Sequence, residues 1–150
     1  MAWRTFLRAH ASVIGELQRE MQEREDLPLT WYDILVNLEC ALGCRLRMQA
    51  LADSILLSRN GLTRLLDRMA AAGLVRREPC PEDRRGTYAV LTERGRQVLR
   101  NATPGHLAGV EHHFLGRLGD EDIEALILAL SKVMKAPEYQ PVSEPVSMEA

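Results

Sequence analysis

Residues 59–72 carry the pattern that most restricts what this chain can fold into. Placing successive residues 100° apart gathers the apolar side chains in one sector of a helix and polar ones in the opposite sector. The apolar sector holds Leu62, Leu65, Leu66 and Met69, the polar sector holds Asn60, Thr63, Arg64 and Asp67, and Arg59 and Arg68 flank the polar sector. A short helix is predicted over residues 48–55, and Ser58 can cap the helix that follows. Two short helices joined by a tight turn predict a helix-turn-helix.

A β-hairpin is predicted directly after this unit. Gly73 favours a helix end in the left-handed conformation, after which "LVRRE" has the composition of a strand. The string "PCPEDRRG" predicts the turn, and "TYAVLT" predicts the returning strand. The expected loop carries Asp83, Arg84 and Arg85, and such a wing can lay cations against a DNA backbone or into a minor groove. Asp83 is two residues from Arg85, a spacing at which a carboxylate can orient a guanidinium.

The formal net charge of −2 conceals a strong asymmetry along the chain. Residues 45–100 hold twelve basic and six acidic residues, or +6, whereas the remainder holds seven basic and fifteen acidic residues, or −8. All twelve cations of the central segment are arginines, whose planar guanidinium matches phosphates and base edges. A solvated face with scattered ion pairs is the alternative. Because the cations lie beside the polar sector of the predicted helix over residues 59–72 and in the predicted hairpin, a nucleic-acid partner is favoured.

Amphipathic helices are predicted on the N-terminal side of this basic centre. The first covers residues 3–21, and the second covers residues 31–42, with Thr30 as its N-cap and Gly43 at its end. A short strand is expected at residues 44–48.

Two further helices are predicted on the C-terminal side. Thr92 can cap a long helix that Pro104 and Gly105 should kink or interrupt before it resumes to Leu118. A last helix begins with an acidic run at residues 120–124, which suits the positive end of a helix dipole. Residues 137–150 are rich in proline and are expected to form a disordered tail.

Length and composition indicate one globular domain that acts in the cytoplasm. No window approaches the eighteen or so apolar residues of a membrane span, and three cysteines do not make a secreted disulfide framework. The chain is too short to add a cofactor-binding α/β domain, and it lacks a glycine-rich strand-turn-helix fingerprint. We therefore expect neither an enzyme nor a cofactor.

The strings "LADSILLSRNGLTRLLDRMAAAGLVRRE" and "PEDRRGTYAVLTERGR" resemble the multiple-antibiotic-resistance regulator (MarR) family of bacterial transcription factors. The resemblance extends from Trp3 to Lys135. It implies a mainly α protein, a winged helix-turn-helix with long N- and C-terminal dimerisation helices and a small β-hairpin wing. The implied domain is residues 1–136, with the DNA-binding lobe at 45–100 and dimerisation helices at 1–25 and 101–136. The implied function is a homodimeric repressor that binds double-stranded DNA at a pseudo-palindromic operator and is released by a small effector.

The resemblance also assigns roles to individual residues. The family's major-groove readers correspond to Ser58, Arg59, Asn60, Thr63 and Arg64, with Arg68 as a phosphate contact. Periodicity selected Asn60, Thr63 and Arg64 independently. The family's wing pair corresponds to Asp83 and Arg85, so that Arg85 enters the minor groove and Arg84 contacts phosphate or assists.

Several alternatives stay open. Family members that sense oxidants direct attention to Cys40, Cys44 and Cys80, although packing is the commoner role of a free cysteine. Cys80, near the wing, is expected to be the better exposed candidate for oxidation. A zinc-responsive protein would use histidines such as His106, His112 and His113, but adjacent helix positions point about 100° apart.

Two other possibilities concern the ligand and the partner. Four aromatic residues could line a cleft for a small aromatic effector or simply belong to the core: Trp3, Trp31, Tyr32 and Phe114. A winged helix that only dimerises or binds proteins, without touching DNA, is a further alternative.

Overall fold

The computed structural model describes residues 1–55, 59–81 and 83–133, with the backbone alone at positions 59, 60, 84 and 85. Its contacts divide the chain into two compact units, Met1–Arg117 and Leu118–Ala150. In the first unit the elements, in order, are α1 (Ala2–Glu25), α2 (Leu29–Cys40), η1 (Leu42–Cys44), β1 (Arg45–Arg47), α3 (Met48–Ser54), α4 (Arg59–Ala71), β2 (Val75–Cys80), β3 (Asp83–Leu91), α5 (Glu93–His113) and η2 (Leu115–Arg117). The described part of the second unit contains α6 (Asp120–Ser131). The predicted mainly helical winged helix is confirmed.

The core of the first unit lies where α2, α3 and α4 meet the sheet. Ile34, Leu35 and Leu38 of α2 are fully buried, and they share the core with Leu51 of α3. The apolar sector predicted for α4 is buried as well, with exposed fractions of 0–7 % at Leu62, Leu65, Leu66 and Met69. Burial of a large apolar side chain stabilises a fold by about 1.5–3 kcal/mol. The buried back of α4 therefore fixes which of its faces points to solvent.

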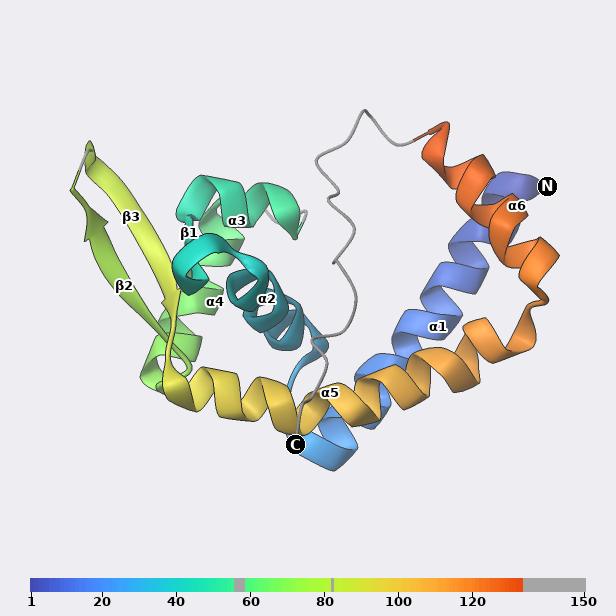
Figure 1. Ribbon diagram of the computed structural model, residues 1–150, viewed down its shortest axis with the longest axis horizontal. Helices are drawn as coiled ribbons and strands as arrows, with labels where there is room; N and C mark the ends of the chain where they lie inside the picture. The colour runs from blue at the N-terminus through green and yellow to red at the C-terminus, as the bar shows by residue number, and fades with distance from the viewer. Residues whose placement is uncertain (56–58, 82, 134–150) are drawn as a thin grey trace. The chain divides into compact units, whose positions relative to one another are not determined.

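The sheet has three antiparallel strands in the order β1-β3-β2, and β2 and β3 form the long hairpin of Figure 1. Gly73 ends α4 at φ +74°, as predicted. The predicted turn was too wide, because Pro79 and Cys80 belong to β2 and Asp83 begins β3. β2 is an edge strand, where a proline without an N–H group can be accommodated without losing a ladder bond.

The hairpin is irregular near its tip. Pro79 pairs with Thr87, but the next residue, Cys80, pairs with Asp83. Residues 84–86 of β3 therefore lie between two registers, which is the arrangement of a bulge and re-aims the side chains that follow. Arg84 and Arg85 belong to this irregular part of a strand rather than to a free loop.

The hairpin is joined to α5 by Thr92, which is the N-cap that the sequence predicted. Its hydroxyl accepts a hydrogen bond from the Gly95 amide at 3.0 Å. The same oxygen lies 2.7 Å from the carbonyl oxygen of Gly73 and 2.9 Å from that of Leu74, to either of which it can donate. One side chain thus connects the end of α4, the start of β2 and the start of α5.

Two helix boundaries differ from the predictions. α2 begins at Leu29, because the amides of Trp31 and Tyr32 both donate to the carbonyl of Pro28, so Thr30 lies inside the helix and does not cap it. α5 continues through Pro104 without interruption and ends at His113, short of Leu118. The hydroxyl of Thr103 donates to the carbonyl of Leu99, a local bond beside the proline.

The described part of the second unit is α6 with its acidic first turn. The amide of Gly119 donates to the Asp122 carboxylate at 3.1 Å, so the start of the helix is capped from within. No residue of α6 is buried within its unit, and Ile127 and Leu128 are 62 % and 63 % exposed. The predicted acidic start is confirmed, and the tail predicted at 137–150 lies outside the described residues.

Candidate nucleic-acid interface

The outward face of α4 presents polar side chains over its buried apolar back. Thr63 is half-buried, whereas Arg64, Asp67 and Arg68 are exposed. Arg59 begins α4, and Asn60 follows it; the structure describes both by their backbone alone. Ser58 lies outside the described residues. The helix therefore has the geometry of a recognition helix, with its apolar sector committed to the core.

The hairpin brings a second set of charged residues to the same unit. Asp83 begins β3 and is exposed, and its carboxylate lies 3.8 Å from Nη1 of Arg47 on β1. Arg84 and Arg85 follow Asp83 in β3, where their backbone alone is described. The predicted orientation of Arg85 by Asp83 stays a prediction.

Three arginines of the sheet were not singled out as site residues by the sequence. The guanidinium carbons of Arg45 and Arg47 lie 4.8 and 5.8 Å from the ring centroid of Tyr88. Arg77 pairs with Asp67 of α4 at 2.8 Å. Alternation along each strand was the available signal, because it places Arg45 and Arg47 on one face and separates Arg77 from Arg76.

The three cysteines are distributed differently from the prediction. Cys80 is 3 % exposed, so the expectation that it is the better exposed cysteine is wrong. Its Cβ atom lies beside Gly86, 2.9 Å from where a Cβ atom on that residue would be. Cys40 is exposed at the end of α2. Cys44 is half-buried, with Nη2 of Arg96 3.3 Å from its sulfur.

The histidines of α5 take part in contacts with α1 and α2. His113 Nε2 lies 2.8 Å from Oε1 of Glu20, and this hydrogen bond lowers the pKa of the Glu20 carboxyl. The ring of His106 packs on Tyr32 with centroids 4.5 Å apart, and burial lowers the pKa of the His106 imidazole. In residues 1–55, 59–81 and 83–133, no three metal-ligand side chains are grouped so that they could hold an ion.

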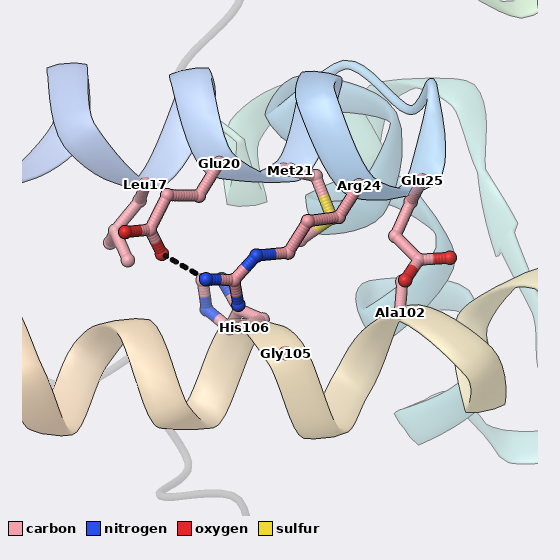
Figure 2. A pocket seen from close by; sticks show the side chains of 8 residues that line it. All are labelled: Leu17, Glu20, Met21, Arg24, Glu25, Ala102, Gly105 and His106. Carbon is pink, nitrogen blue, oxygen red and sulfur yellow. Dashed lines mark ion pairs between the residues drawn. The ribbon is translucent and has the colours of Figure 1, made fainter.

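A small cavity lies between α1 and α5. Figure 2 shows Glu20 and Arg24 of α1 directed toward each other above His106, with their charged groups 3.9 Å apart. The cavity volume is about 10 Å³, which is room for about one water molecule.

The aromatic residues proposed for an effector cleft have separate surroundings. Trp3 is 67 % exposed on α1 and stacks on Phe6, while Tyr32 is buried and its hydroxyl lies 3.4 Å from Oγ1 of Thr103. Trp31 packs against the core. The described side chains therefore give Trp3 and Tyr32 different partners.

These features define the chain as a winged-helix protein with a basic, solvent-facing α4 and an arginine-bearing hairpin. A sequence model of the MarR family matches residues 25–86. The transcriptional regulator HosA of Escherichia coli O111:H- is 38 % identical over 119 residues, which is 79 % of this chain and 85 % of HosA.

Solved structures of MarR family regulators are also similar to this chain. AbsC, a MarR family transcriptional regulator of Streptomyces coelicolor, is 41 % identical over 88 % of each chain, with a TM-score of 0.84. Sco3205 of the same organism, a MarR family transcriptional regulator solved in complex with DNA, is 35 % identical over 88 % of this chain and 82 % of its own, also with a TM-score of 0.84. This chain belongs to the MarR family and is a transcriptional regulator of that family.

Proposed function

We propose that the protein is a homodimeric repressor that binds a pseudo-palindromic operator and is released by a small effector. The observation that carries DNA binding is the division of α4, whose apolar residues are buried while Arg64 and Arg68 face solvent. A charged hairpin in the same unit gives the protein a second contact with the duplex. Sco3205, at 35 % identity, was solved with DNA, which supports the same partner for this chain.

Specific roles are proposed for the residues of α4 and of the hairpin. Ser58, Arg59, Asn60, Thr63 and Arg64 read base edges in the major groove, where arginine pairs with guanine and asparagine with adenine. Arg68 binds phosphate.

The hairpin residues have complementary roles in this proposal. Arg85 enters the minor groove, Asp83 orients it, and Arg84 contacts phosphate or assists. Phosphate contacts supply affinity without sequence preference, so specificity rests mainly on α4.

Dimerisation is proposed through helices whose apolar side chains are uncovered within their own units. On α1 these are Trp3, Phe6, Leu7 and Ile14, each at least 37 % exposed. On α6 they include Ile127 and Leu128. Exposed apolar patches of this kind mark protein interfaces, and a second copy would place two α4 helices on one duplex. The proposed domain comprises residues 1–136, with the lobe at 45–100 between dimerisation helices.

Release by an effector is proposed as a population shift. An effector that binds better to a dimer with unsuitable α4 spacing lowers the population that binds DNA. The cavity between α1 and α5 is too small for an aromatic acid, so such a ligand would require these helices to separate or would bind elsewhere.

The proposal is tested by selecting binding sites from a randomised duplex library with the full chain. The recovered duplexes should share a two-fold-related sequence, and the protein should bind them at least about a thousandfold more tightly than random duplex. Affinity for both should fall as salt rises. A library from which no shared sequence is recovered would instead favour a winged helix that binds only proteins.

No helix in the described ranges combines the length and apolar character needed to cross a bilayer. We propose that the regulator acts in the bacterial cytoplasm and catalyses no reaction. A redox- or zinc-responsive regulator of the same fold remains the second candidate, and the accessible Cys40 is the observation that favours the redox form.

A further inference from the structure

Two neighbouring arginines of β2 have partners on opposite sides of the strand. Nη2 of Arg76 lies 2.7 Å from Oε1 of Glu78, two residues along the same strand. Nη2 of Arg77 lies 2.8 Å from Oδ1 of Asp67 and donates to the main-chain carbonyl of Thr63 at 3.0 Å. Both partners of Arg77 belong to α4, so Arg77 links the hairpin to the helix whereas Arg76 does not.

The contact of Arg77 lies beside the reading face of α4, the face that carries the proposed readers Thr63 and Arg64. Thr63 is itself a proposed reader, Arg64 is the next residue, and Asp67 is one turn farther along α4. A guanidinium is planar, and its donors point in fixed directions, so two bonds to one helix restrict both the distance and the angle between β2 and α4. From Arg77, β2 continues to Cys80, whose partner Asp83 begins the charged part of the hairpin.

We propose that Arg77 is a positioning residue for DNA recognition: through Asp67 and the Thr63 carbonyl it sets the placement of the reading face of α4 relative to the hairpin. This inference rests on the proposed function. The side chains of Arg77 and Asp67 are 35 % and 61 % exposed, and partly exposed ion pairs add little to folding stability. The effect of Arg77 is therefore expected in DNA discrimination rather than in the melting temperature.

The test uses the full chain, a duplex selected by the wild-type protein, and a random duplex of equal length. Arg77→Met should weaken binding to the selected duplex by about tenfold, because misplaced readers lose base contacts, while binding to random duplex stays within about twofold. The dependence of affinity on salt should not change, because no phosphate contact is removed. Arg76→Met is the matched control and should leave both affinities unchanged.

Asp67→Asn is the second variant, because it removes the same contact from the helix side. It should reduce discrimination by a similar factor, and the double variant should be no worse than either single variant. If Arg77 only neutralised a carboxylate near the phosphates, Asp67→Asn would instead strengthen binding to both duplexes. Thermal unfolding of each variant checks that the fold is retained.

Three results would overturn the inference. Arg77→Met could bind both duplexes equally less well with a weaker salt dependence, which would make Arg77 a direct phosphate contact. The variant could match the wild type, or Asp67→Asn could strengthen binding. Failure of the proposed function is distinguishable, because the wild-type protein itself would then fail to prefer the selected duplex over the random one.

Discussion

Arg64 is the residue on which the proposed recognition of DNA depends most directly. It is exposed in the structure, it follows Thr63 on the outward face of α4, and periodicity alone placed it there. Leu62 and Leu66, two positions before and after it, are buried on the opposite side of the helix, so the direction of the Arg64 side chain is set by core packing.

Replacing Arg64 by alanine should relax sequence preference. A side chain that reads a base contributes about 1–3 kcal/mol of discrimination, so Arg64→Ala is expected to lose that much for the selected duplex at one position of each half-site. Competition between single-base variants of the duplex measures it. Arg100→Ala, an exposed arginine on α5, is the control and should keep the preference. An unaltered preference in Arg64→Ala would remove it from the readers.

At the residue level, the sequence predicted which side chains face the core or the solvent better than it predicted which residues they contact. The buried and exposed positions of α4 followed from a 100° repeat, because one helix face must enter the core. The burial of Cys80 and the bonds of Arg77 could not be predicted, because they depend on the register of β2 with β3 and on the packing of β2 against α4. The side-chain roles assigned from the sequence stay predictions for four residues: Arg59, Asn60, Arg84 and Arg85.

The junction between the hairpin and α5 leaves no room for a side chain at Gly95. Among the glycines of the described residues, an added Cβ atom would meet its nearest neighbour most closely there. A Cβ atom added at Gly95 would collide with the carbonyl oxygen of Leu74 and lie 2.9 Å from Cδ1 of Leu91. The amide of Gly95 also donates a hydrogen bond to the hydroxyl of the N-cap Thr92. The absence of a side chain at Gly95 therefore allows α5 to start directly against β2.

Gly95→Ala should destabilise the protein although alanine favours helices. Overpacking of this kind costs about 1–3 kcal/mol, more than the roughly 1 kcal/mol that Gly-to-Ala exchange contributes inside a helix. Gly105→Ala on the same helix is the control, since an added Cβ would meet only Arg24 Nη1 at 4.0 Å, and it should stabilise. Urea unfolding measures both variants; equal stability of the two would show that the junction can relax.

Elements were predictable where a local signal acted alone. Thr92 and Gly73 were located correctly because a cap and a left-handed glycine need only their neighbours. Thr30 was misassigned because the carbonyl of Pro28 accepts the first helical bonds. The hairpin turn was predicted too wide because Pro79 is tolerated on an edge strand, and strand order is a tertiary property.

At the scale of the whole molecule, the charge asymmetry and the exposed apolar side chains of α1 and α6 both bear on the proposed dimer. The basic centre and the acidic remainder differ by fourteen charges, from +6 to −8. In the proposed dimer, repulsion between the two basic centres would be offset by apolar contact between the chains, and by the DNA when it is bound.

The protein should sediment at micromolar concentration with twice its chain mass of 16.9 kDa. Introducing charges on α6 with Ile127→Glu and Leu128→Glu should shift the population toward the single-chain mass, because a charged side chain in an apolar interface lacks solvation. Glu124→Ala, on an exposed position of the same helix, should have little effect. A wild-type protein that is monomeric throughout would exclude the dimer.

The uninterrupted course of α5 has a mechanical consequence. Its 21 residues run from the Thr92 junction to the contacts with α1, and Figure 1 shows them as one helix. A helix of this length extends about 30 Å, so a tilt of about 5° at the α1 end would displace the base of the hairpin by about 3 Å. In the proposed dimer, each half-site would be read through contacts with a tolerance well below that displacement. A small motion far from the duplex would then be enough to take the protein out of register with the proposed operator.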